Sequence, residues 1–262
     1  MLVAMRWMGA VTGLAILAAA GFWTAAAAGR APELAVSRIL VEGNERLAEG
    51  EILETLGLHP GSNILTLELE TLKRQMLLST WVKDVELARV LPATLTLKVV
   101  ERVPLGIAVV ESRLYLIDGD GTLLDEMAPG YRDLTLPLVR GLVDERGKLI
   151  PGRCQLAGRL LSALASDPSL EEVVSEMDVS SGAESIRIWL RRPPLTFIGG
   201  EADFITRLAE LVPLSEEIRG RFPSVDAVDV RFQGRVYLQL GPDAILEEAV
   251  PDLEQPVVFG GR

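Results

Sequence analysis

Two stretches indicate the fold of the N-terminal part of this chain. Residues 36–47 read VSRILVEGNERL, and residues 81–105 read WVKDVELARVLPATLTLKVVERVPL. In the second stretch the apolar residues Leu95, Leu97 and Val99 alternate with polar ones. A period of two is typical of a strand with one buried face. We therefore predict a strand in the first stretch and two further strands in the second.

Turn residues and two helical segments complete this region. Gly43-Asn44 is a turn signal after the first strand, and Pro92 presets the backbone angle of a turn between the later two. Between them, residues 49–58 and 69–79 carry apolar residues at the spacing of an amphipathic helix. The sequence thus predicts strand, helix, helix, strand, strand over residues 36–105.

An apolar segment lies just before this region. Residues 8–28, MGAVTGLAILAAAGFWTAAAA, contain no charged side chain. About 20 apolar residues are needed to cross a hydrocarbon core as a helix. We predict a single transmembrane helix, with residues 1–7 in the cytoplasm and the rest of the chain outside it. The alternative is a cleaved signal peptide, because Ala25–Ala28 offers small residues for cleavage.

The C-terminal half is rich in strand signals. We predict an antiparallel β-rich domain over residues 106–240, with helices at 153–166 and 201–211. The last two strands are expected at 227–232 and 235–240, around a turn at Gln233-Gly234. Residues 241–262 lack a sustained period and are expected to form a mobile tail.

Composition narrows the possible functions. The chain has 26 Lys+Arg against 37 Asp+Glu, for a net charge of −11, whereas nucleic-acid binding needs a basic surface. Cys154 is the single cysteine and His59 the single histidine, which excludes an internal disulfide and a cysteine-based metal cluster. We expect no cofactor, no metal, no catalytic residue and no small-molecule substrate.

One motif favours an enzyme. Residues 116–124, LIDGDGTLL, match the first motif of haloacid-dehalogenase-type phosphatases, in which the first Asp attacks phosphorus and Mg²⁺ offsets the phosphate charge. That chemistry would use Asp118 and Asp120. It also needs a parallel sheet with a helix after the motif, and here strand signals surround it. We interpret the motif as a turn in which Asp and Gly accept unusual backbone angles.

The last predicted strands favour a binding function. A strand at the end of an open sheet exposes unpaired N–H and C=O groups, to which a partner can add a strand of its own. Phe232 and Tyr237 could anchor such a partner, and Arg231 and Arg235 would favour an acidic segment.

The N-terminal region resembles a POTRA domain, and residues 81–105 are similar to the bacterial cell-division proteins of the FtsQ/DivIB family. The similar features are the turn at Leu91-Pro92, the strand TLTLKV at 94–99, and the segment ERVP at 101–104. The resemblance implies an α+β chain with a transmembrane helix at 8–28, a POTRA domain at 36–105 and an FtsQ-type β domain at 106–240.

The resemblance also implies partners and a location. It implies a non-enzymatic scaffold of the inner membrane at the division septum, which binds the FtsB–FtsL pair and links early and late division proteins to septal peptidoglycan synthesis. FtsK, FtsW and FtsI are further candidate partners. By position, the contact strand is implied to contain Arg231, Phe232, Gln233 and Gly234, followed by Arg235, Val236 and Tyr237. An extracytoplasmic phosphatase and a POTRA-bearing transport or assembly component are the alternatives.

Overall fold

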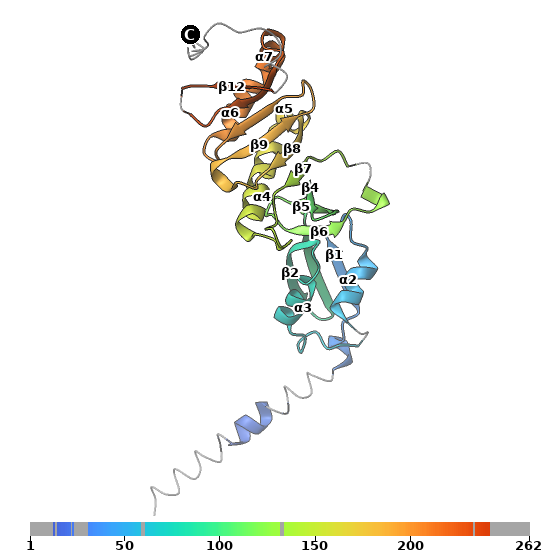
Figure 1. Cartoon of the computed structure of the whole chain (residues 1–262). Coiled ribbons are helices and arrows are strands. Elements are labelled where there is room, and N and C mark those ends of the chain that lie inside the picture. The colour runs from blue at the N-terminus through green and yellow to red at the C-terminus, as the bar shows by residue number, and fades with distance from the viewer. Residues whose placement is uncertain are drawn as a thin grey trace, which may run out of the picture. The chain divides into compact units, whose positions relative to one another are not determined.

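The structure is a computed structural model that describes residues 13, 15–21, 23, 31–58, 61–131, 134–232 and 234–241. The chain divides into two compact units between Arg102 and Val103 (Figure 1). Residues 13, 15–21 and 23 are helical, and no helix among the described residues is long and apolar enough to cross a membrane. The other residues of the predicted span, its cytoplasmic segment 1–7 and tail residues 242–262 lie outside the described part.

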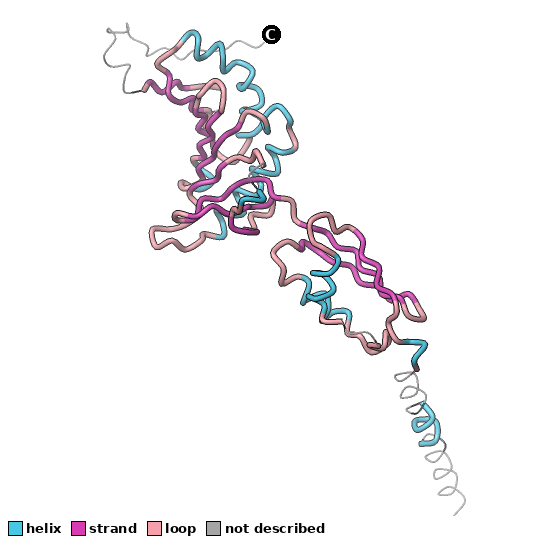
Figure 2. Tube along the Cα trace, turned by 90° about the vertical axis from the view of Figure 1, so that its right-hand side faces the viewer, coloured by secondary structure: helices cyan, strands magenta, loops and turns pink. Residues whose placement is uncertain are grey.

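Unit 1 is a three-stranded sheet with two helices. After a short 3-10 turn at Pro32–Leu34 come β1 (Arg38–Glu42), α2 (Glu49–Leu56), α3 (Leu69–Met76), β2 (Val82–Val90) and β3 (Thr94–Glu101). The strand order is β1-β3-β2, with β1 parallel and β2 antiparallel to the central β3 (Figure 2). The predicted strand, helix, helix, strand, strand order is confirmed.

The core of unit 1 lies between the helices and one face of the sheet. The alternation in β3 buries Leu95, Leu97 and Val99, each at most 2% exposed. The helical spacing directs Ile52 and Leu56 of α2, and Leu72 and Met76 of α3, into the same cluster. Each apolar period in the sequence therefore marks the buried face of its element.

Glu101 holds the turn that follows β1. Its carboxylate accepts hydrogen bonds from the backbone N–H groups of Glu45, Arg46 and Leu47 at 2.9–3.1 Å. Gly43 lies in the same turn with φ +82°, and a Cβ there would lie 2.3 Å from the carbonyl oxygen of Val99. The glycine and the carboxylate together fix the path of the chain from β1 to α2.

Unit 2 contains a nine-stranded sheet. Its strands are β4 (Pro104–Val110), β5 (Arg113–Asp118), β6 (Leu123–Glu126), β7 (Leu138–Arg140), β8 (Val174–Asp178), β9 (Ile186–Leu190), β10 (Thr196–Gly199), β11 (Val225–Asp229) and β12 (Tyr237–Leu240). The order across the sheet is β12-β11-β10-β9-β8-β7-β4-β5-β6. β6 and β12 are therefore the two ends of the described sheet.

The prediction of a purely antiparallel sheet is wrong. β4 with β7, β7 with β8, and β10 with β11 are parallel pairs. Parallel neighbours need a long crossover connection. Helices supply two of these crossovers: α4 (Pro151–Ala165) and α5 (Pro168–Glu171) between β7 and β8, and α6 (Phe204–Leu211) and α7 (Ser215–Arg221) between β10 and β11. Strand direction was not evident from the sequence, because side chains alternate equally in parallel and antiparallel strands.

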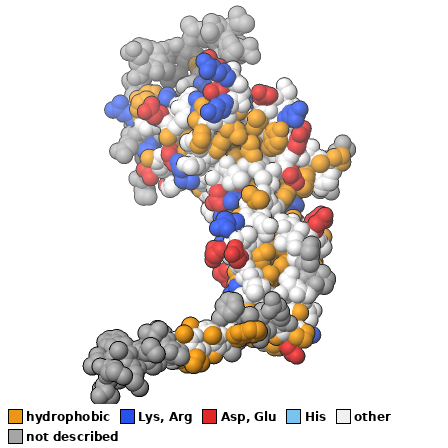
Figure 3. All heavy atoms as spheres, turned by 90° about the horizontal axis from the view of Figure 1, so that it is seen from below, with side chains coloured by type: hydrophobic (Ala, Val, Ile, Leu, Met, Phe, Trp, Pro, Cys, Tyr) orange, Lys and Arg blue, Asp and Glu red, His pale blue; other side chains and the backbone are white. Residues whose placement is uncertain are grey.

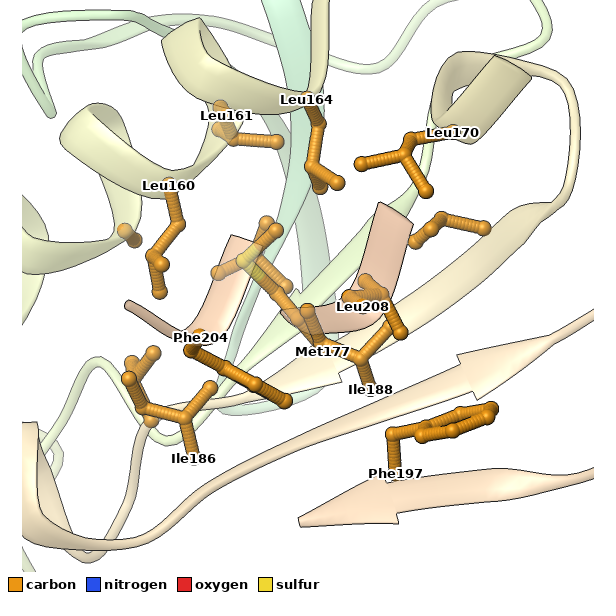
Figure 4. Close-up of a cluster of buried hydrophobic side chains, with 14 of the residues drawn as sticks. Leu160, Leu161, Leu164, Leu170, Met177, Ile186, Ile188, Phe197, Phe204 and Leu208 are labelled. Atoms are coloured by element: carbon orange, nitrogen blue, oxygen red, sulfur yellow. The ribbon is translucent and has the colours of Figure 1, made fainter. Parts of the chain in front are cut away.

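Unit 2 also has two short helices, α5 and α7, beside the two that were predicted. Leu160, Leu161 and Leu164 of α4 point toward Met177, Ile186 and Ile188 of the sheet, and α6 adds Phe204 and Leu208 to the same cluster (Figure 4). This core joins β8–β11 and the helices into one body. It fixes the position of β11, against which the terminal strand pairs.

Candidate partner-binding site

The candidate site is the β11–β12 hairpin at one end of the unit 2 sheet. β12 pairs with β11 in antiparallel register, with Tyr237 opposite Asp229 and Leu238 opposite Val228. Within the described residues no strand lies beyond β12. The strand also carries exposed apolar side chains, with Tyr237 43% and Leu240 54% exposed.

The outer side of β12 presents backbone donors. The N–H of Gly241 donates to the carbonyl of Ser224 at 2.8 Å and so points toward β11. N–H groups alternate in direction along a strand. Those of Tyr237 and Gln239 therefore point toward β11, and those of Leu238 and Leu240 point outward. The outer edge has the chemistry that strand addition requires.

The connection between the two strands is wider than predicted. β11 ends at Asp229 and β12 begins at Tyr237, so residues 230–232 and 235–236, which were predicted to belong to the strands, lie outside them. The guanidinium of Arg207, on α6, donates to the carbonyl oxygens of Val230 and Phe232, the latter at 3.0 Å. These bonds connect the residues that follow β11 to α6.

Arg231 is engaged within the hairpin. Its Nε lies 3.0 Å from Oδ1 of Asp229, and its Nη2 lies 2.6 Å from Oδ2. Asp229 is only 3% exposed, and its burial acts to raise its pKa. The hydrogen bonds and charge of Arg231 outweigh burial and hold the pKa of Asp229 below its ordinary value. Arg231 was predicted to meet an acidic partner, but the structure pairs it with Asp229 of its own chain.

Two aromatic rings connect the loop to β12. Phe232, 49% exposed, meets Tyr237 edge-to-face with 5.1 Å between ring centroids. The guanidinium carbon of Arg231 lies 5.8 Å from the centroid of the Phe232 ring. The three side chains of Arg231, Phe232 and Tyr237 therefore contact one another in sequence.

Three of the remaining predicted site residues, Gly234, Arg235 and Val236, line a groove. Gly234, with φ +67°, and Arg235 are exposed, Val236 packs partly on the core, and Gln233 lies outside the described residues. A groove of about 320 Å³ runs between this loop and α6. Its lining residues are Arg207, Glu210, Leu211, Leu214, Val230, Phe232, Gly234, Arg235 and Val236. The contribution of Arg207 was missed because no local pattern connects it with Val230, 23 residues later in the chain. Asp229 is only two residues from Arg231, but nothing in the sequence indicated that its carboxylate is buried.

The LIDGDGT motif forms the β5–β6 hairpin. Oδ1 of Asp118 accepts hydrogen bonds from the N–H groups of Asp120 (3.0 Å) and Thr122 (2.8 Å), and Asp118 is 2% exposed. A Cβ on Gly158 of α4 would lie 2.4 Å from the nitrogen of Gly121, so helix and turn are in close contact. β5 and β6 are antiparallel, and this arrangement supports the interpretation as a structural turn.

Cys154 and His59 are the single cysteine and the single histidine of the sequence. Cys154 is buried in α4, and burial raises the pKa of its thiol, as expected for a packing residue. His59 lies outside the described residues. No group of three or more His, Cys, Asp or Glu within the described ranges is placed to hold a metal ion.

The chain is similar to known proteins in both units. Residues 34–102, which cover unit 1 from its 3-10 turn to its end, match the family model described as "POTRA domain, FtsQ-type". The cell division protein FtsQ of Geobacter sp. (strain M21) is 27% identical over 213 residues, covering 79% of this chain and 76% of that protein. Unit 1 is therefore an FtsQ-type POTRA domain, and most of the chain is similar to FtsQ cell division proteins.

Further FtsQ relatives extend the similarity over both units. FtsQ of Koribacter versatilis is 28% identical over 218 residues, which cover 81% of this chain and 62% of the relative. FtsQ of Rickettsia bellii is 33% identical over a shorter segment of 86 residues. Matches of about four-fifths of the chain reach beyond the POTRA domain, so the FtsQ-type similarity includes much of the nine-stranded unit.

Proposed function

We propose that this chain is a non-enzymatic scaffold of the bacterial division machinery that binds a partner strand along the outer edge of β12. The FtsQ-type POTRA domain at residues 34–102 and the similarity of most of the chain to FtsQ proteins support the role in division. The terminal position of β12 in the described sheet, next to two exposed aromatic rings, is the observation that carries the mode of binding.

The partner in this proposal is the FtsB–FtsL pair, as the family resemblance implies. A strand of the partner pairs with the outward N–H groups of Leu238 and Leu240. Phe232 and Tyr237 then offer apolar contact, and Arg235 offers an exposed positive charge near an acidic segment. Charges of both signs are interspersed on the face in Figure 3, with no continuous basic surface, which favours a protein partner over nucleic acid.

The membrane location is part of the same proposal. Residues 8–28 form a single transmembrane anchor, the N-terminus lies in the cytoplasm, and both units lie outside it at the division septum. This part rests on the uncharged sequence of residues 8–28 and on the family. It places the binding edge on the side of the membrane where septal wall is made.

The decisive experiment separates backbone pairing from side-chain contact. Leu240→Pro and Leu240→Ala both remove the leucine side chain, but only proline removes the outward N–H. Binding of the purified full chain to the FtsB–FtsL pair of the same cell is measured by calorimetry. We expect Leu240→Ala to weaken binding slightly and Leu240→Pro to weaken it at least tenfold further, with melting temperatures alike. Equal affinities of the two variants would contradict strand addition at β12.

Side-chain contacts need a second set. Phe232→Ala and Tyr237→Ala should each weaken binding, and Arg235→Glu should weaken it through charge repulsion that added salt relieves. Asp125→Ala, on β6 at the opposite end of the sheet, serves as the control and should bind as the wild type does. Equal loss in the Asp125 variant would mean that the sheet end carrying β12 is not the binding site.

A further inference from the structure

One end of unit 1 carries a group of exposed apolar side chains that neither the core nor β12 explains. Leu65 is 46% exposed, Val90 50% and Leu91 62%. Leu65 lies in the loop between α2 and α3, whereas Val90 and Leu91 lie at the turn between β2 and β3. Single exposed apolar residues are common, but a group of them on one surface marks a binding site or a membrane contact.

Hydrogen bonds place these residues at one end of the unit. The guanidinium of Arg89, at the end of β2, donates to the carbonyl oxygens of Ile64 and Leu67. The N–H of Ser37 donates to the carbonyl of Ala93 at 2.9 Å. Figure 2 shows the α2–α3 loop and the β2–β3 turn at the same end of the unit. We name this end, with Leu65, Val90 and Leu91, the apolar tip.

The chain enters unit 1 at the apolar tip. The N–H of Val36 donates to the carbonyl of Ser62 at 2.9 Å, and Ala35 forms a bridge with Asn63. The uncharged segment 8–28 ends three residues before Ala31. Three residues span at most about 11 Å when fully extended. The N–H of Ile64 donates to the carbonyl of Leu34, six residues after Ala28, at 2.8 Å. If residues 8–28 cross the membrane, the tip is therefore tethered within roughly 20 Å of its surface.

We propose that the apolar tip inserts into the outer interface of the membrane in which the N-terminal segment is anchored. Leu65, Val90 and Leu91 enter the boundary between headgroups and acyl chains, where apolar side chains gain free energy on leaving water. This proposal rests on the anchor in the proposed function. It makes unit 1 a membrane-seated domain held at two points, the anchor and the tip.

The occupant is a lipid interface, and its contact is apolar rather than ionic. The elements that meet at the tip carry charges of both signs: Glu33 lies in the 3-10 turn and Glu68 directly before α3, whereas Arg38 begins β1 and Arg89 lies near the end of β2. The guanidinium of Arg89 is already bonded to two carbonyl groups of the chain. The tip therefore carries little net positive charge that could attract anionic lipids. Insertion should be the same in zwitterionic and anionic bilayers.

Unit 1 provides a matched control at its other end. Leu78 is 82% exposed and lies two residues after α3. The following residues lead into Val82, which pairs with Glu101 at the far end of β3. A strand of eight residues spans roughly 25 Å, so Leu78 lies about that distance from the tip.

The test uses the full chain in phosphatidylcholine vesicles. Leu91→Cys, Leu65→Cys and Leu78→Cys are made in a Cys154→Ala background and labelled with nitrobenzoxadiazole, and lipids with a doxyl quencher near the headgroup are added. We expect quenching of at least twofold at positions 65 and 91 and almost none at 78, unchanged when 30% phosphatidylglycerol is present. Equal quenching at all three positions, or quenching that needs phosphatidylglycerol, overturns the proposal.

Failure of the tip is distinguishable from failure of the anchor and of the binding function. Flotation with the vesicles shows whether the chain is anchored in the membrane. If the chain floats but labels at positions 65 and 91 are not quenched, insertion of the tip is overturned and the anchor stands. If the chain does not float, both the anchor and insertion of the tip are overturned. Partner binding at β12 is measured separately and is unaffected by the labels on unit 1. Leu65→Asp with Leu91→Asp is a second readout, and it should abolish quenching at a label on Val90→Cys.

Discussion

Arg231 and Asp229 form a bidentate ion pair at the end of β11. Nε of Arg231 lies 3.0 Å from Oδ1 of Asp229, and Nη2 lies 2.6 Å from Oδ2. The carboxylate is buried, whereas the guanidinium is partly exposed and also faces the Phe232 ring. The pair connects the stability of the hairpin to the placement of an aromatic side chain in the candidate site. In this structure Arg231 therefore contacts Asp229 and Phe232 of its own chain.

Arg231→Ala should destabilise unit 2 through Asp229. It leaves a buried carboxylate without its side-chain donor, which costs about 1–3 kcal/mol in the free energy of unfolding. Urea denaturation measures this change. Arg235→Ala, an exposed arginine of the same loop, is the control and should change stability by less than about 0.5 kcal/mol. Equal effects of the two variants would mean that the Asp229 pair contributes nothing specific.

The same pair predicts a dependence on pH. Because the pKa of Asp229 is lowered in the folded state, its ion pair stabilises the fold at pH values above the unfolded pKa, about 3.9 for Asp. This contribution is lost as the pH falls through the lower, folded pKa. The free energy of unfolding of wild type minus that of Asp229→Asn should therefore be largest near neutral pH and shrink below about pH 4. A difference that stays constant from pH 6 to pH 2 would contradict the assignment.

The contact between α4 and the β5–β6 turn predicts the effect of two glycine substitutions on one helix. Gly158→Ala places a methyl group 2.4 Å from the nitrogen of Gly121 and should destabilise by about 1–3 kcal/mol. Gly152→Ala lies in open space on the same helix and should be neutral, or stabilising by up to about 1 kcal/mol. Thermal unfolding of both variants measures the difference. Similar melting temperatures of the two variants would contradict this prediction, because they would mean that the β5–β6 turn moves away from the added methyl group at little cost in stability.

Asp118 allows the turn and the phosphatase interpretations to be compared directly. Asp118→Ala removes the acceptor of two backbone hydrogen bonds and should cost about 1–3 kcal/mol, whereas Asp118→Asn keeps an oxygen at that position and should cost less. With Mg²⁺ and a generic phosphate ester, wild type and Asp118→Asn should show the same background turnover. Turnover in the wild type that Asp118→Asn abolishes would restore the enzyme hypothesis.

The local elements followed from periodicity because each apolar residue must find a buried face. Leu95, Leu97 and Val99 mark the inner face of β3 in the sequence and in the structure. Gly43-Asn44 marked the turn after β1 in the sequence, and Gly43 lies in that turn with φ +82°. Of the candidate site, the sequence indicated the terminal strands, the exposed Phe232 and Tyr237, and their place near the end of the fold.

Tertiary structure decided what depends on distant partners. Strand direction in unit 2 was not evident from alternation, because parallel and antiparallel strands share a period of two; the crossovers through α4–α5 and α6–α7 decided it. The end of β11 is bonded to Arg207 of α6, and the contact of Arg207 with Val230 spans 23 residues. The sequence by itself therefore determined which residues are buried and in which elements. Only the three-dimensional fold decided which charges neutralise one another, and which strand ends the described sheet.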